Sequence, residues 1–91
     1  MNSYSYSQAI DEELVSKLRR LAKIDKTLYT AVQKKMVQIT EKPYLGKPLH
    51  GKLKGKRRVQ IGHFVLIYGI DEKERRVIFL DFTHHDEAYK Q

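Results

Sequence analysis

The stretch "GKPLHGKLKGKRRVQIGHFVLIYGI", residues 46–70, joins a basic, glycine-rich segment to the most hydrophobic run of the chain. Within residues 64–68 the apolar side chains fall into two alternating sets. Val65 and Ile67 form one set, and Phe64, Leu66 and Tyr68 form the other. Successive side chains of a strand point to opposite faces of its sheet, and strands that are apolar on both faces are buried on both. This run therefore predicts a central strand covered on both sides.

Two more strand-like runs flank this central strand, at residues 57–61 and 76–82. Gly62 and residues 71–74 supply turn signals between the three runs. Strands joined by such short turns pair in the antiparallel direction. Alternation of Ser and Tyr within residues 2–8 indicates one more short strand at the start of the chain. We therefore expect a small antiparallel sheet of three or four strands.

Two segments in the first half of the chain repeat one apolar spacing of four, four and three residues, which is typical of an amphipathic helix. The two sets are Ile10, Leu14, Leu18, Leu21 and Leu28, Val32, Met36, Ile39. Asp25 is expected to cap the second helix, and Pro43 to end it near Glu41, because the residue before a proline avoids the helical conformation. A short helix capped by Thr83 is expected near the C-terminus. The predicted fold class is α+β: an N-terminal helical hairpin packed on the sheet, with a short C-terminal helix.

The positive charge of the chain is concentrated in one segment. The formal net charge is +7, and residues 42–63 hold seven Lys or Arg with no Asp or Glu. Residues 1–41 carry +2 and residues 64–91 carry −2. A solvated surface that only aids solubility is the alternative, but such surfaces usually mix both signs. We therefore expect the basic segment to bind a polyanion.

Composition argues against several classes of protein. The chain has no cysteine, which excludes disulfides and thiolate metal sites and fits a reducing cytoplasm. No spacing among its four histidines predicts a zinc site. The longest apolar run, residues 64–68, is far shorter than the roughly 20 residues of a membrane span, and the first residues lack the pattern of a signal peptide. We expect one cytoplasmic domain over residues 1–91.

The order of these elements and the motif in residues 46–70 resemble the RelE/ParE superfamily of toxins from type II toxin–antitoxin systems. The family often reads G-x-P-L-x-G-x-L-x-G, then an arginine, then R-x-G-x-Y-R-x-x-Y. The matching positions are Gly46, Pro48, Leu49, Gly51, Leu53, Gly55, Arg58, Gly62 and Tyr68, with Phe64 in place of the first tyrosine. His84 and Tyr89 match the C-terminal H-R-x-x-V-Y of the family. Val65 and His85 stand where this pattern has arginines, and Gln60 stands where a basic residue is common.

The resemblance implies an activity and a set of partners. RelE-like toxins cut messenger RNA, mostly in the ribosomal A site, and need no metal or other cofactor. Their reaction is attack of a 2′-hydroxyl on the adjacent phosphate, which requires a base, cations at the phosphate and an acid for the leaving oxygen. An acidic antitoxin is also implied, and we expect it to cover the helical hairpin and the basic face and to mask Arg58.

Carried onto this chain, the resemblance assigns catalytic roles to four residues. Arg58 is expected to clamp the phosphate, because a guanidinium binds phosphate oxygens in pairs and stays charged. His84 and His85 are expected in the first turn of the last helix, where His84 serves as the base and His85 replaces the family arginine. Tyr89 is expected to stack on a base, position the phosphate or anchor the tail.

RNA binding is assigned to the basic segment. Lys52, Lys54 and Lys56 alternate, so an extended backbone would place them in one row along one side. Such a row tracks a nucleic-acid backbone, and Arg57 is expected to add a backbone contact. His50 and His63 lie in polar turns and rank below the other histidines as candidates.

Three functions remain open on these residues. The first is a ribosome-dependent messenger-RNA endonuclease. The second is a ParE-like toxin that inhibits DNA gyrase without cutting RNA, which the replacements at Val65 and His85 favour. The third is a non-catalytic module of the same fold that binds RNA or protein.

Overall fold

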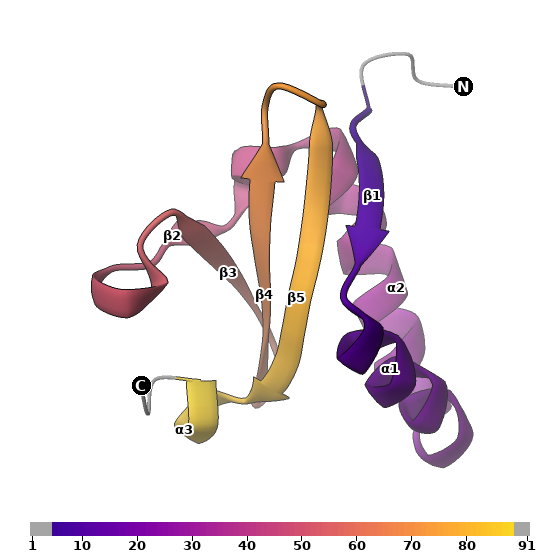
Figure 1. Cartoon of the computed structure of the whole chain (residues 1–91). Helices are drawn as coiled ribbons and strands as arrows, with labels where there is room; N and C mark the ends of the chain where they lie inside the picture. Colours follow the sequence, from indigo (N-terminus) through magenta and orange to yellow (C-terminus); the bar gives the residue numbers. More distant parts are fainter. Residues whose placement is uncertain (1–4, 89–91) are drawn as a thin grey trace.

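The computed structural model describes residues 5–88 and has an α+β architecture, as predicted (Figure 1). Its elements, in chain order, are β1 (Ser7–Ile10), α1 (Glu12–Ile24), α2 (Lys26–Glu41), the 3₁₀ turn η1 (Pro43–Leu45), β2 (Lys47–Pro48), the 3₁₀ turn η2 (Gly51–Leu53), β3 (Lys56–Ile61), β4 (Phe64–Asp71), β5 (Arg76–His84) and α3 (His85–Ala88). Helices α1 and α2 form a hairpin on one side of the sheet, and α3 lies on the other side.

The sheet has five strands, in the order β1-β5-β4-β3-β2, rather than the three or four expected. Strands β3, β4 and β5 form the predicted antiparallel meander. Strand β2 pairs with β3 over two residues, which is too short for an alternating pattern to show in the sequence. Strand β1 pairs with β5 in the parallel direction, so the sheet is mixed. This pairing joins the two ends of the chain, and no local pattern predicts it.

The start of α1 differs from the expected position. Ile10 is the last residue of β1 and pairs with Phe79, so its placement in the helical stripe was wrong. The helix begins after Asp11, whose carboxylate accepts a hydrogen bond of 3.0 Å from the Glu13 N–H. Satisfying an exposed N–H in the first turn is what favours aspartate at this position, and it sets the boundary two residues after the apolar spacing begins.

The boundaries of α2 agree with the prediction. The Asp25 carboxylate accepts a hydrogen bond of 3.0 Å from the Leu28 N–H, and the helix ends at Glu41, two residues before Pro43. No helix within residues 5–88 is long and apolar enough to cross a bilayer.

The end of β5 extends further than the sequence predicted. Thr83 is a strand residue opposite Val65 and not the cap of a helix. The ladder with β4 continues to His84, which lies opposite Phe64. Because the backbone of Thr83 and His84 is paired with β4, it is not available for a helix start, and α3 begins only at His85.

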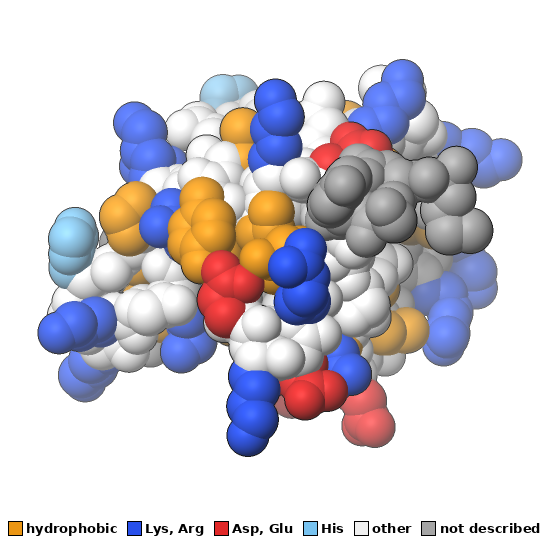
Figure 2. All heavy atoms as spheres, turned by 90° about the horizontal axis from the view of Figure 1, so that it is seen from above, with side chains coloured by type: hydrophobic (Ala, Val, Ile, Leu, Met, Phe, Trp, Pro, Cys, Tyr) orange, Lys and Arg blue, Asp and Glu red, His pale blue; other side chains and the backbone are white. Residues whose placement is uncertain are grey.

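One end of the molecule is closed by a polar cluster around the β4–β5 turn. The hydroxyls of Tyr6 and Tyr44 both donate to the carboxylate of Glu72, the first over 2.5 Å. The Arg75 guanidinium lies 4.9 Å from the centroid of the Tyr6 ring. Figure 2 views this end and shows hydrophobic side chains in the middle, acidic side chains beside them, and Lys or Arg both next to this patch and toward the rim. The cluster joins the segment before β1, the segment after α2 and the β4–β5 turn.

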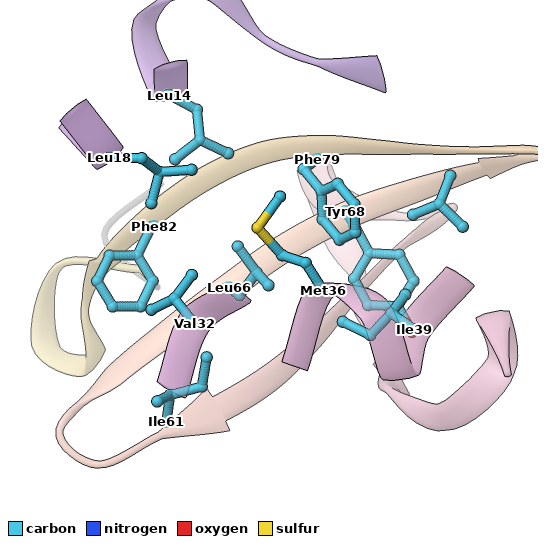
Figure 3. Packing of buried hydrophobic residues seen from close by; sticks show 11 residues of the cluster. Leu14, Leu18, Val32, Met36, Ile39, Ile61, Leu66, Tyr68, Phe79 and Phe82 are labelled. Atoms are coloured by element: carbon cyan, nitrogen blue, oxygen red, sulfur yellow. The ribbon is translucent and has the colours of Figure 1, made fainter. Parts of the chain in front are cut away.

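The hydrophobic core has two layers, one on each face of β4. The larger layer lies between the sheet and the helices, where side chains of α1 and α2 point at the strands (Figure 3). Its buried members are Leu14, Leu18, Val32, Met36, Ile39, Ile61, Leu66, Tyr68, Val77, Phe79 and Phe82. The smaller layer, on the opposite face, contains Leu49, Val65, Ile67 and Ala88. The two alternating sets of β4 therefore separate as the sequence predicted.

An irregularity in β5 serves the larger layer. The register between β4 and β5 shifts between Ile67 and Tyr68, where β5 has an extra residue. Such a bulge changes the alternation of the strand that contains it. Phe79 and Phe82, which are three residues apart, can therefore both face the helices.

Candidate functional site

A hollow of about 600 Å³ opens on the face of the sheet opposite the helical hairpin. It is lined by Lys47, Pro48, Leu49, His50, Gly51, Lys52, Leu53, Arg58 and His85, and is termed the basic hollow below. Three of these side chains are cations and two are imidazoles, and none of the lining residues found within residues 5–88 is acidic. Leu49 belongs to the smaller apolar layer. The hollow therefore presents positive charge above an apolar floor.

Arg58 reaches the basic hollow from β3. It lies opposite Ile67 of β4 on one side and opposite Lys47 of β2 on the other. Side chains directly opposite each other in an antiparallel pair lie on the same face, with their Cβ atoms roughly 4.5–5.5 Å apart. The side chains of Lys47 and Arg58 therefore project together, so an anion bound between them would reduce their mutual repulsion.

Lys47 is the residue of this site that sequence reasoning missed. Its presence in the acid-free segment was visible, but it shares that segment with six other bases. Its pairing with Arg58 depends on the two-residue strand β2, which no sequence pattern indicates.

The segment that precedes Lys47 is held in place by a buried tyrosine, Tyr68. Tyr68 has no exposed surface, and its hydroxyl accepts a hydrogen bond from the Gly46 N–H (2.9 Å) and donates one to the Pro43 carbonyl (2.7 Å). Burial raises the pKa of this hydroxyl above its ordinary value, which keeps it protonated and able to donate. A Cβ on Gly46 would lie 2.6 Å from the Tyr68 hydroxyl and 2.7 Å from the Arg58 carbonyl oxygen, so only glycine fits.

Arg57 also holds the segment around Gly46 in place, and its contacts together with those of Tyr68 are termed the Gly46 clamp. Its guanidinium donates a hydrogen bond of 2.6 Å to the Gly46 carbonyl and lies 4.7 Å from the centroid of the Tyr44 ring. It lies opposite Tyr68, whose ring belongs to the helix-side layer, and is not among the residues that line the basic hollow. Arg57 thus holds the segment that precedes Lys47, while its neighbour Arg58 points to the other face.

The expected row of three lysines does not form. Residues 51–53 make a 3₁₀ turn, in which the Lys54 N–H donates to the Gly51 carbonyl over 3.1 Å. Gly51 and Gly55 have φ angles of +65° and +93°, which glycine adopts easily and which turn the chain. Lys52 therefore lines the basic hollow, whereas Lys56 lines a separate hollow beside Asp81 and Glu87, and Lys54 lines neither.

The two adjacent histidines lie in different surroundings. His85 lines the basic hollow with Arg58. The His84 ring contacts the edge of Phe64, with centroids 5.5 Å apart, and stacks at 6.4 Å on His63. Because Phe64 packs against the helix-side layer, His84 lies at the end of that layer and outside the hollow.

Hydrogen bonding also sets the tautomer of His84. Its Nδ1 accepts a hydrogen bond of 3.2 Å from the Asp86 N–H, so the proton of the neutral ring is on Nε2.

The predicted role of Tyr89 falls outside the residues that the structure describes. Within residues 5–88 there is no group of three or more His, Asp or Glu side chains that could hold a metal ion.

The fold and the hollow define a small basic α+β domain in which a helical hairpin covers one face of a sheet and cations gather on the other. Residues 9–89 match the family described as ParE toxin of type II toxin–antitoxin system, parDE. The chain belongs to this toxin family, within the RelE/ParE superfamily that the motif in residues 46–70 resembles.

Individual relatives agree with this assignment. The chain is 44% identical over 75 residues to the putative toxin RelE4 of Methanocaldococcus jannaschii, covering 81% of this chain and 80% of the relative. The toxin–antitoxin complex RelBE2 from Mycobacterium tuberculosis contains a chain of similar structure, with a TM-score of 0.76, 24% identity and coverage of 88% and 98%. The isolated E. coli RelE toxin is similar with a TM-score of 0.77, 20% identity and coverage of 93% and 92%. Because these two solved structures are only 24% and 20% identical to this chain, their similarity shows that this chain has the same fold and shows nothing further.

Proposed function

We propose that this toxin is a ribosome-dependent endoribonuclease that cleaves messenger RNA at the basic hollow, without a metal ion. The observation that supports this most is that Arg58 and His85, which are distant in the sequence, line one hollow together with Lys47 and Lys52. Cations and an imidazole around one space are the groups that phosphodiester cleavage requires. RNA is the expected substrate because its 2′-hydroxyl supplies the nucleophile that DNA lacks.

The cations hold the phosphate and stabilise its transition state. The Arg58 guanidinium pairs with the two non-bridging oxygens of the scissile phosphate, while Lys47, directly across the β2–β3 ladder, neutralises the same group. Negative charge grows on these oxygens as phosphorus becomes five-coordinate. Because the cations are already in place, they bind the transition state more strongly than the ground state.

The imidazoles move the protons. In this proposal His85 takes the proton of the 2′-hydroxyl as the 2′-oxygen bonds to phosphorus. The bond from phosphorus to the 5′-oxygen breaks, and His50, the other histidine lining the hollow, returns a proton to that oxygen. The products are a 2′,3′-cyclic phosphate and a free 5′-hydroxyl. Imidazole suits both roles because it exchanges protons near neutral pH.

The test is induced expression in a tolerant host, followed by mapping of the ends of cellular messages. The wild type is compared with Arg58→Ala and His85→Gln, and His84→Gln serves as the matched control outside the hollow. We expect cuts within translated codons that fall by about 10²–10⁴-fold in His85→Gln, fall at least as far in Arg58→Ala, and persist in His84→Gln. Undiminished cutting in the first two variants would overturn the proposal. Loss only in His84→Gln would move the base to His84.

A second candidate function has one observation in its favour. Val65 stands where the RelE-like pattern has an arginine, and it is fully buried in the smaller apolar layer. A ParE-like toxin that inhibits DNA gyrase does not need the missing cation. Growth arrest with gyrase-dependent DNA breakage and no new RNA ends would select this function.

We further propose an acidic antitoxin as the partner of this toxin in the cytoplasm. The similar chain from M. tuberculosis was solved in a toxin–antitoxin complex, and the net charge of +7 favours an acidic partner. Binding over the basic hollow would mask Arg58. If a co-expressed antitoxin left binding of short RNA unchanged between the free toxin and the complex, this placement would be wrong.

A further inference from the structure

A second cationic surface lies on the outward side of α2, away from the sheet. Lys26, Thr27, Thr30, Ala31 and Lys34 line an open hollow of about 500 Å³, and all five are exposed. The opposite side of α2 is buried against the sheet through Val32, Met36 and Ile39. Because the basic hollow opens on the other face of that sheet, the two cationic surfaces point in opposite directions.

Folding separates the charges of the helical hairpin. Residues 14–40 contain seven Lys or Arg and one acid, Asp25, whose carboxylate is engaged in capping α2. Of the seven bases, Lys17 is paired with Asp81 at 2.7 Å. The other four acids of residues 1–41 lie at the start of α1 and at the end of α2, which an antiparallel hairpin brings to the same end. Away from that end, Arg19, Arg20 and Lys23 of α1 are exposed as well.

The spacing on α2 suits a repeating anion. Lys26, Thr30 and Lys34 are four residues apart, so they form one stripe along the helix. At 1.5 Å per residue the two lysines are separated by about 12 Å along the axis. A duplex strand carries a phosphate about every 3.4 Å of its axis, so the stripe spans several phosphates. Threonine hydroxyls and lysines are both common contacts to phosphate oxygens.

The composition of the stripe discriminates between polyanions. It contains no aromatic or large apolar side chain. Protein partners obtain most of their affinity from such anchors, and single-stranded nucleic acids obtain it from stacking on aromatic rings. A double-stranded backbone needs neither, because its affinity comes from cations that neutralise phosphates.

We infer that the Lys26–Thr30–Lys34 stripe docks on the phosphate backbone of a double-stranded nucleic acid. This surface is separate from the basic hollow, and the inference holds whether or not the hollow cuts RNA. Its role is to orient the domain on a large nucleic-acid target while the opposite face remains open to a substrate. Duplex RNA and duplex DNA share the chemistry that it recognises.

The experiment compares two double variants that remove the same charge. Both are made in an Arg58→Ala background, which removes the phosphate-binding arginine of the basic hollow. Lys26→Gln/Lys34→Gln alters the stripe, and Lys73→Gln/Arg76→Gln alters exposed bases of the β4–β5 turn and the start of β5. Gln has nearly the helix propensity of Lys, so α2 should remain intact. Binding of a short blunt-ended RNA duplex is measured by fluorescence anisotropy over a series of KCl concentrations.

We expect the magnitude of the slope of log K against log salt concentration to decrease by about 1.8 in the stripe variant, because each phosphate contact contributes about 0.9. In the control variant the slope should stay equal to that of Arg58→Ala alone. A DNA duplex of the same sequence and a polyglutamate chain are measured in parallel. Equal losses for RNA and DNA support a shared phosphate backbone, and a loss for RNA alone assigns the surface to RNA. Equal slopes in the two double variants, or a loss confined to polyglutamate, would overturn the inference.

Discussion

The two faces of the sheet differ in how much apolar surface they bury. The helix-side layer contains eleven buried residues, whereas the layer under the basic hollow contains four. Two long helices cover the first face, and a glycine-rich segment with a single turn of helix covers the second. Since burial of apolar area is the main favourable term in folding, most of the stability should come from the helix side. The other face can then present lysine, arginine and histidine at the surface.

The largest test of this difference is a pair of leucine truncations. Leu66→Ala, fully buried on the helix side, should lower the free energy of unfolding by about 4 kcal/mol, because the surrounding strands and helices cannot close the cavity. Leu49→Ala removes the same atoms from a loop that can collapse onto the sheet, and should cost about 2 kcal/mol. Urea denaturation measures both. Equal losses would mean that the two faces contribute equally.

Gly46→Ala tests the segment that connects the helix side of the sheet, through Tyr68, to the basic hollow, through Lys47. The added Cβ would collide with the Arg58 carbonyl and the Tyr68 hydroxyl, and we expect a loss of about 3 kcal/mol from overpacking against backbone. Gly69→Ala is the matched control, since its Cβ would meet only Leu80 at 4.0 Å. If denaturation shows both variants near the wild type, the clamp on this segment is looser than the distances indicate.

Tyr68→Phe removes the clamp without adding atoms. Two buried backbone groups, the Gly46 N–H and the Pro43 carbonyl, lose their partner, which should cost about 2 kcal/mol. Tyr29→Phe, whose hydroxyl bonds the exposed Gln33 side chain, should cost less than about 0.5 kcal/mol. Because Lys47 follows this segment, Tyr68→Phe should also weaken binding of short RNA at the basic hollow under conditions where the variant is fully folded. Unchanged affinity would separate the clamp from the site.

The smallest expected effect is a titration at the end of the molecule. Hydrogen bonds from Tyr44 and Tyr6 hold the pKa of Glu72 below its ordinary value and raise the pKa of both tyrosines. The stabilisation from the Glu72 carboxylate is therefore present above the ordinary carboxyl pKa and is lost as the pH falls through the lowered one. NMR titration of Glu72 should show the lowered pKa, and Tyr44→Phe should return it toward the ordinary value. A Glu72 pKa that does not respond to Tyr44→Phe would show that this bridge does not form in solution.

The fold was predictable wherever its signal was local. The apolar spacing of the helices, the cap at Asp25 and the two-sided strand at residues 64–68 are all read within one element. Ile10 and Thr83 were misplaced at boundaries, where pairing with β5 and β4 respectively takes residues that their own neighbours assign to helices. Helix caps and strand ladders compete for the same backbone groups, and the sequence alone does not show which one prevails.

Some of the residues that line the candidate site were predictable from the sequence, and its geometry was less so. The acid-free segment indicated an anion site, and Arg58, Lys52 and His85 do line one hollow. Lys47 was missed and His84 lies elsewhere, because both placements depend on contacts between distant segments. The row of lysines failed for a local reason, since two glycines at positive φ turn a segment that was assumed to be extended.

By itself, the sequence determined the class of fold, the toxin family and the position of the positive charge, since apolar periodicity, motif spacing and formal charge are properties of neighbouring residues. Only the tertiary structure decided which cations share a surface. It set Lys47 beside Arg58 through a two-residue strand, turned Arg57 away to hold Gly46, and placed Lys26 and Lys34 around one hollow on the outward side of α2. The physical reason is that a side chain's neighbours in space are fixed by strand register, turns and helix packing, which act between residues far apart in the chain.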